Sequence, residues 1–141
     1  MKKMYGIGAI LLSGALMMSV MASPALAEEK SKMVIQVSDN DAAKWNLALN
    51  NAKNIQKDLG KANVELEIVA YGPGINMLKA ESEVGNRISE SMESGIKVLA
   101  CQNTMRNLKL NKEDMLTNIA YVPAGVIEIM QRQQQGWAYL R

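Results

Sequence analysis

Cys101 is the only cysteine in the chain, and it lies in the stretch GIKVLACQNTMRNL at residues 95–108. A single thiol cannot form an internal disulfide, so it serves either as a reactive group or as a small apolar residue. The thiolate is the form of cysteine that acts as a nucleophile. Free cysteine is also among the most frequently buried residue types. Composition alone leaves both interpretations open.

The position of Cys101 favours a reactive thiol. A predicted strand at 96–100 ends directly before it, and a short helix follows, with Asn103 or Thr104 as the expected N-cap. A cysteine between a strand end and a helix start lies near unpaired N–H groups and the positive end of the helix dipole, which favour the thiolate. The residues alone leave a reactive and an inert Cys101 both open. For a reactive thiol, we predict that Cys101 is the catalytic residue, that Asn103 and Thr104 stabilise its anion, and that Tyr71 and Gly72 line the pocket.

Other candidate sites are weaker. The sequence contains no histidine, which excludes Ser-His-Asp and Cys-His nucleophile pairs and histidine-ligated metals, and no metal or cofactor is predicted. Asp39 and Asp41 resemble a carboxylate pair, but their place before a helix favours a capping role. The turn YGPGIN at 71–76 could hold a phosphate or flavin group on its backbone, although Pro73 removes one donor.

Strands and helices alternate along the chain. Short apolar or alternating runs predict strands at 33–37, 64–71, 96–100, 118–122 and 137–141. Helical spacing predicts helices at 42–59, before Gly95 and after Pro123, with shorter turns around Met77, after Cys101 and from Asn111. This order predicts a small doubly wound α/β fold: a mainly parallel sheet of about five strands with helices on both faces. Ligands of such sheets bind outside the carboxyl ends of the strands.

The first residues have the pattern of a secretory signal peptide: Lys2 and Lys3, an apolar run, and a small-x-small ending at Ala27. We predict cleavage after Ala27, export to the periplasm or outside, a flexible segment at 28–32 and a single domain at 33–141. Without the two leader lysines, 14 basic and 14 acidic residues remain. This balance argues against binding to nucleic acid or, after cleavage, to an anionic membrane.

Four segments together resemble the DsrE/DsrF-like family of small α/β proteins associated with sulfur relay. They are WNLALNNAKNIQKDLG at 45–60, YGPGINML at 71–78, GIKVLACQNTM at 95–105 and YVPAGVIEIMQRQQQGWAYLR at 121–141. The resemblance implies an oligomeric domain in which one cysteine carries sulfur as a persulfide between partner proteins, and Cys101 matches that cysteine. The well-studied relays are cytoplasmic, so their partners and pathways do not carry over to a chain expected to be exported.

Two functions follow from these observations. The first is a sulfur carrier that holds sulfane sulfur on Cys101 and passes it to a partner thiol, with donor and acceptor unidentified. The alternative is a non-catalytic binding or assembly module with an inert, buried Cys101. In either case the apolar strand 137–141 invites pairing at a sheet edge. We therefore expect a homo-oligomer, a trimer or a multiple of it, with contacts through that strand or the helix before it.

Overall fold

The computed structural model describes residues 29–141, so the expected leader and its cleavage site lie outside the described residues. Five strands form one sheet in the order β4-β3-β2-β1-β5, and every neighbouring pair is parallel. Their bounds are β1 Ser31–Val37, β2 Val64–Ala70, β3 Lys97–Cys101, β4 Ala120–Val122 and β5 Ala138–Leu140. The predicted α/β fold is confirmed. The last strand, β5, lies at an edge of the sheet beside β1.

Helices connect the strands. The α-helices are α1 Ala42–Leu59, α2 Gly85–Glu93, α3 Gln102–Asn107 and α4 Gly125–Gln134, and the 3-10 helices are η1 Lys61–Asn63, η2 Gly72–Leu78 and η3 Lys112–Asp114. Asp41 caps α1, because its side chain accepts hydrogen bonds from the Ala43 and Lys44 N–H groups. The turns predicted around Met77 and after Asn111 are formed by the 3-10 helices η2 and η3. Among residues 29–141, no helix is long and apolar enough to cross a membrane.

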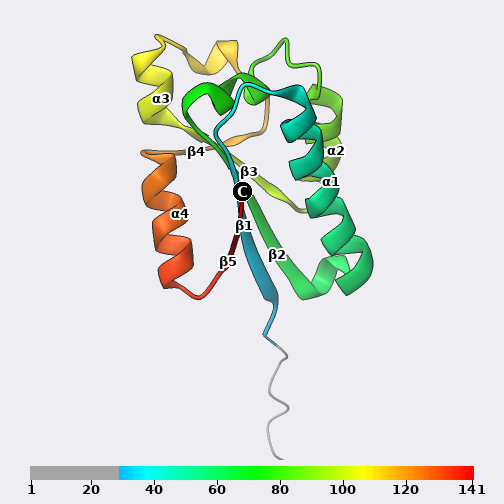
Figure 1. The fold of residues 1–141 in the computed structure, drawn as a ribbon. Helices are drawn as coiled ribbons and strands as arrows, with labels where there is room; N and C mark the ends of the chain where they lie inside the picture. The colour runs from blue at the N-terminus through cyan, green and yellow to red at the C-terminus, as the bar shows by residue number, and fades with distance from the viewer. Residues whose placement is uncertain (1–28) are drawn as a thin grey trace, which may run out of the picture.

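The two faces of the sheet are covered unequally. Figure 1 shows α1 and α2 on one side of the sheet and α4 on the other. The larger core lies under α1 and α2 and includes Ile35, Leu49, Ile68 and Ile88, each no more than 1% exposed. The smaller core lies under α4 and consists of Val34, Val69, Leu99, Ile129 and Trp137. A single helix of ten residues therefore holds the second face of the sheet.

The face under α4 also contains a buried ion pair. The alternation in β2 predicts that Glu67 faces solvent, yet its side chain is fully buried. The Arg132 guanidinium donates two hydrogen bonds of 2.8 Å to the two Glu67 oxygens, and it also lies over the Trp137 ring at 4.7 Å. A paired, hydrogen-bonded carboxylate can be buried where an isolated one cannot. The pair ties α4 to the middle of the sheet.

The first strand begins earlier than its apolar run indicates. Ser31 and Lys32, which were expected in a flexible segment, pair with Val64 and Glu65 as the first residues of β1. Strand pairing uses backbone N–H and C=O groups, so it extends beyond the apolar side chains that mark a strand in the sequence. Every residue of β2 from Val64 to Ala70 therefore has a partner in β1.

Candidate active site

The carboxyl ends of two neighbouring strands, β2 and β3, bring the predicted site residues together. Cys101 is the last residue of β3, and Tyr71 and Gly72 follow β2 directly. Because β2 and β3 are adjacent and parallel, these residues lie at the same edge of the sheet. Cys101 and Tyr71 lie on the same face as Leu99 and Val69, the face that α4 covers.

Cys101 is itself the N-cap of α3. The helix begins at Gln102 with no connecting residue, and the Cys101 sulfur accepts a hydrogen bond from the Thr104 N–H at 3.5 Å. The expectation that Asn103 or Thr104 caps this helix is therefore wrong. It failed because the strand runs straight into the helix, so its final residue takes the capping position. The thiol thus occupies the place where a helix usually receives a serine or aspartate oxygen.

Thr104 connects Cys101 to the turn after β2. The Thr104 hydroxyl hydrogen-bonds to the Cys101 thiol, and its oxygen accepts a hydrogen bond of 2.9 Å from the Gly72 N–H. A hydroxyl has one proton to donate and two lone pairs. Because the Gly72 N–H occupies a lone pair, the hydroxyl proton remains available to the sulfur. Gly72 has a φ of +54°, a conformation that glycine adopts without strain.

The start of α4 supplies a further donor that sequence analysis missed. Hydrogen bonding from the Gly125 N–H, at the start of α4, lowers the pKa of the Cys101 thiol. A Cβ atom at position 125 would lie 3.0 Å from the Tyr71 Cβ and 3.2 Å from a Val69 methyl carbon. Glycine therefore lets the helix start approach the sheet closely enough to reach Cys101. The only signal in the sequence was a glycine two residues after Pro123 at a helix start.

These contacts decide the ionisation of the thiol. Burial raises the pKa of Cys101, which is 4% exposed, because the thiolate is poorly solvated there. Hydrogen bonds from the Thr104 hydroxyl and from the Gly125, Thr104 and Asn103 N–H groups oppose this effect and leave the pKa below its usual value. The site therefore favours the thiolate despite its burial.

The other two predicted residues have more limited roles. The Asn103 N–H contributes least to the lowered pKa of Cys101, and it donates to the Pro123 carbonyl at 3.1 Å. The Asn103 side chain accepts a hydrogen bond from Arg106 and is exposed. Tyr71 is half-buried beside the Cys101 site, where burial and then the neighbouring Tyr139 raise the pKa of its hydroxyl. Tyr71 therefore remains a neutral phenol at neutral pH.

The backbone N–H groups of the two glycines in the glycine-proline turn donate hydrogen bonds within the protein. The Gly72 N–H is bound to Thr104, and the Gly74 N–H donates to the Tyr71 carbonyl at 3.1 Å. A Cβ atom at position 74 would collide with the Val37 carbonyl. Glycine at this position therefore lets the turn lie close to β1. Neither N–H is free to bind a phosphate, which argues against the phosphate or flavin interpretation of YGPGIN.

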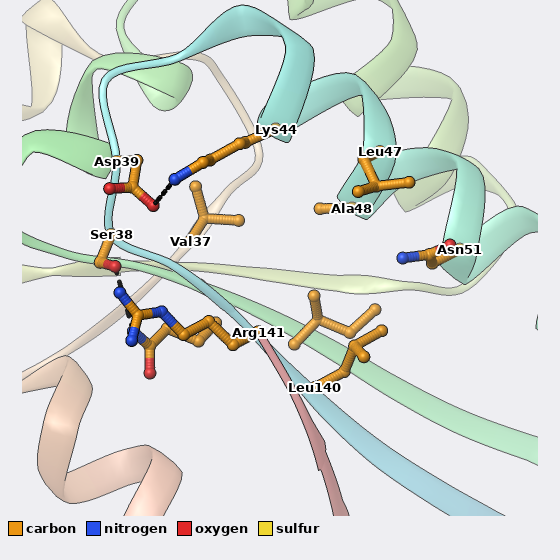
Figure 2. A pocket seen from close by; sticks show the side chains of 11 residues that line it. Val37, Ser38, Asp39, Lys44, Leu47, Ala48, Asn51, Leu140 and Arg141 are labelled. Carbon is orange, nitrogen blue, oxygen red and sulfur yellow. Dashed lines mark hydrogen bonds and ion pairs between the residues drawn. The ribbon is translucent and has the colours of Figure 1, made fainter.

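A cleft of about 420 Å³ lies at the same edge of the sheet, between α1 and the β1–β5 pair. Figure 2 shows Asp39, Ser38 and Arg141 at one end of it and Leu47, Asn51 and Leu140 at the other. Lys44 forms an ion pair of 2.9 Å with Asp39, and its hydrogen bond lowers the pKa of that carboxyl. The cleft does not include Cys101. Asp39 thus pairs with Lys44, and Asp41 caps α1, so the two carboxylates do not form a joint site.

Comparisons with known proteins agree with this architecture. The sequence profile of the DsrE/DsrF-like family matches residues 31–141. The structure of MTH1491 from Methanobacterium thermoautotrophicum, a protein of unknown function, superposes with a TM-score of 0.75 at 34% identity, covering 79% of this chain and 99% of that one. No significant match is found among curated proteins.

Two more distant structures share the fold alone. BT1422 from Bacteroides thetaiotaomicron is 22% identical with a TM-score of 0.62, over 78% of this chain and 93% of its own. The ychN protein of E. coli is 10% identical with a TM-score of 0.62, over 79% and 97%. The family profile extends over all five strands, including the strand that ends in Cys101. The chain therefore belongs to the DsrE/DsrF-like family, whose members are generally associated with sulfur relay.

Proposed function

We propose that this protein is a sulfur carrier that holds sulfane sulfur as a persulfide on Cys101 and transfers it to a partner thiol. The observation that carries the proposal is the convergence of donors on one sulfur. The donors are the Thr104 hydroxyl and backbone N–H groups from two separate elements, α3 and α4, and all of them lower the pKa of Cys101. Donors of this kind stabilise an anion, whether the anion is the thiolate or the terminal sulfur of a persulfide.

The chemistry needs one cysteine and no external oxidant. The Cys101 thiolate attacks the outer sulfur of a donor persulfide, R–S–SH. A new S–S bond forms on Cys101, the donor S–S bond breaks, and the donor leaves as the thiolate R–S⁻. An acceptor thiolate then attacks the outer sulfur on Cys101 and becomes the new persulfide, which restores the Cys101 thiolate. Each step exchanges one S–S bond for another, so oxidation levels balance.

Mass spectrometry of the intact protein tests the proposal. After treatment with inorganic polysulfide and removal of the excess, we expect a species heavier by one sulfur atom, which a thiol reductant removes. Cys101→Ser should remain unmodified, because a serine hydroxyl does not form the persulfide. Ser31→Ala serves as a control for handling, since Ser31 is exposed and begins β1, whereas Cys101 lies at the carboxyl end of β3. A native protein that gains no sulfur under conditions in which its thiol reacts with iodoacetamide would rule the carrier function out.

The burial of Cys101 favours a second candidate function. With 4% exposure, the sulfur has the environment of an inert core residue in a non-catalytic binding or assembly module. The two candidates differ in how the thiol reacts. An inert cysteine reacts with iodoacetamide only when denaturant opens the fold, whereas a carrier thiol reacts in the native protein. A native reaction at less than about one-hundredth of the rate in denaturant would favour the assembly module.

We also propose that the chain forms a homo-oligomer, a trimer or a multiple of it, after export and removal of the leader. Three large apolar side chains of α4 face outward: Val126, Ile127 and Met130 are 58%, 44% and 46% exposed. The adjacent β5 is an edge strand with free backbone groups on its outer side. A shared interface over α4 and β5 would cover both features and bring the Cys101 site close to a neighbouring subunit.

Light scattering on residues 28–141 should therefore give a mass above that of the monomer at micromolar concentration. Ile127→Ser combined with Met130→Ser should shift the mass towards the monomer, because both side chains lose apolar contact area. Leu108→Ser is the matched control, since Leu108 is 51% exposed but lies outside α4 and β5. A monomeric wild-type protein, or equal effects of the α4 pair and the control, would contradict the proposed interface.

A further inference from the structure

A second cleft, separate from the Cys101 site, lies between α1 and α2 and has a volume of about 450 Å³. Its floor includes Leu49 and Ile96, which are 1% and 3% exposed. The proposed sulfur chemistry uses no residue of this cleft. The volume is within the range of about 300–1,000 Å³ that small-molecule sites occupy.

The cleft is strongly cationic although the expected mature chain is balanced in charge. Lys53, Lys57, Lys61 and Arg87 line it, and Glu90 is the one carboxylate among its lining residues. Four positive charges and one negative charge thus surround a single concave surface. Such a concentration of one sign attracts ligands of the opposite charge, and the field is stronger within a cleft than on a flat surface.

These cations lack carboxylate partners within the described part of the chain. No ion pair involves Lys53, Lys57, Lys61 or Arg87 there. Lys53 and Lys57 are one helical turn apart, and neither has an acidic residue three or four positions away in the sequence. Like charges at this spacing destabilise a helix by a few tenths of a kcal/mol. The arrangement therefore keeps positive charge in the cleft at a small cost to the helix.

The walls of the cleft are fixed by two sets of hydrogen bonds between the helices. At one end the Arg87 guanidinium donates to the side-chain oxygens of Asn46 and Asn50, the second at 2.6 Å. At the other end Gln56, which is 8% exposed, exchanges hydrogen bonds of 2.8 and 2.9 Å with Ser94. Neutral amides hold Arg87 in place without cancelling its charge. The site is therefore preorganised, which reduces the entropic cost of binding.

We infer that this cleft binds a small polyvalent oxyanion, a molecule bearing phosphate or sulfate groups. Several oxygens with more than one negative charge match three lysine ammonium groups and a fixed guanidinium, each a donor of charge-assisted hydrogen bonds. An organic part of the ligand would rest on the apolar floor at Leu49 and Ile96. The site is independent of Cys101, so it stands whether or not the protein carries sulfur.

Pyrophosphate, phosphate and acetate at matched ionic strength are suitable probes. Pyrophosphate at about 10 mM should raise the melting temperature by at least about 5 °C over acetate, with phosphate in between. In ¹H–¹⁵N NMR spectra, the amide shifts should be confined to 53–61 and 87–94. Lys53→Gln/Lys57→Gln should bind pyrophosphate at least about tenfold more weakly, through the loss of two charge-assisted contacts. In acetate, this variant should melt no lower than the wild type because it loses a repulsion.

Lys30→Gln/Lys109→Gln is the matched control, because both lysines are exposed and lie outside the cleft. It removes the same net charge and should leave pyrophosphate binding within about twofold of the wild type. Equal weakening in the two double variants would overturn the inference, since binding would then depend on net charge alone. Stabilisation by acetate equal to that by pyrophosphate, or shifts spread over other basic residues, would overturn it as well.

Discussion

Arg132→Met is expected to lower the free energy of unfolding by about 3 kcal/mol, because it leaves the fully buried Glu67 carboxylate without its bidentate partner. Methionine fills much of the volume of the arginine stem and retains apolar contact with Trp137. The loss therefore reports mainly the unpaired charge. Urea unfolding monitored by circular dichroism measures it, provided that the m-value is unchanged.

Two further variants separate the charge from the packing. Lys97 lies 3.5 Å from the same Glu67 carboxylate, but its ammonium side chain is 53% exposed. Lys97→Met should cost less than about 1 kcal/mol, as expected for an exposed ion pair. Glu67→Gln/Arg132→Met removes both charges and should recover part of the loss, since no uncompensated carboxylate remains. A cost for Arg132→Met no larger than that for Lys97→Met would show that the pair does not hold α4 on the sheet.

The sequence was sufficient for the architecture because the fold follows from local periodicity. The helical spacing of Trp45, Leu49, Ala52 and Ile55 predicts α1 with its observed bounds, 42–59. Strands separated by helices then require parallel pairing through right-handed crossovers. The order of the strands is harder to predict from the sequence, because β5 pairs with β1 across more than one hundred residues of chain. No local pattern encodes that pairing.

Features that depend on tertiary contact were missed. Glu67 has the spacing of a solvent-facing strand residue, and only Arg132, 65 positions later, makes its burial tolerable. Gly125 contacts Tyr71 and donates to Cys101, yet its sequence neighbours identify it only as part of a helix start. In contrast, Thr104 and Gly72 were predicted beside Cys101 because strand ends in a parallel sheet share one edge. The shared edge of the parallel strands therefore identified the region of the site, but not which groups donate hydrogen bonds to Cys101.

The second large effect concerns the thiol itself. Thr104→Val is expected to slow the reaction of Cys101 with iodoacetamide at neutral pH by about tenfold, because a hydrogen bond to a charged group contributes about 1.5–3 kcal/mol. Burial raises the pKa of Cys101, and the Thr104 hydroxyl is the leading donor that lowers it. Without this donor the thiolate forms only at higher pH. The midpoint of the rate against pH should therefore move upward in the variant.

Stability should change with pH in the same sense. In the wild type the pKa of Cys101 is lower in the folded than in the unfolded state, so its contribution is fully present above the unfolded pKa and is lost as the pH falls through the folded pKa. The stability gap between wild type and Thr104→Val should consequently widen at alkaline pH. Thr104→Ser keeps the hydroxyl that binds Gly72 and Cys101 and should retain both the rate and the midpoint. A valine variant that loses stability equally at all pH values, with an unchanged midpoint, would mean that Thr104 only packs beside the thiol and does not control its ionisation.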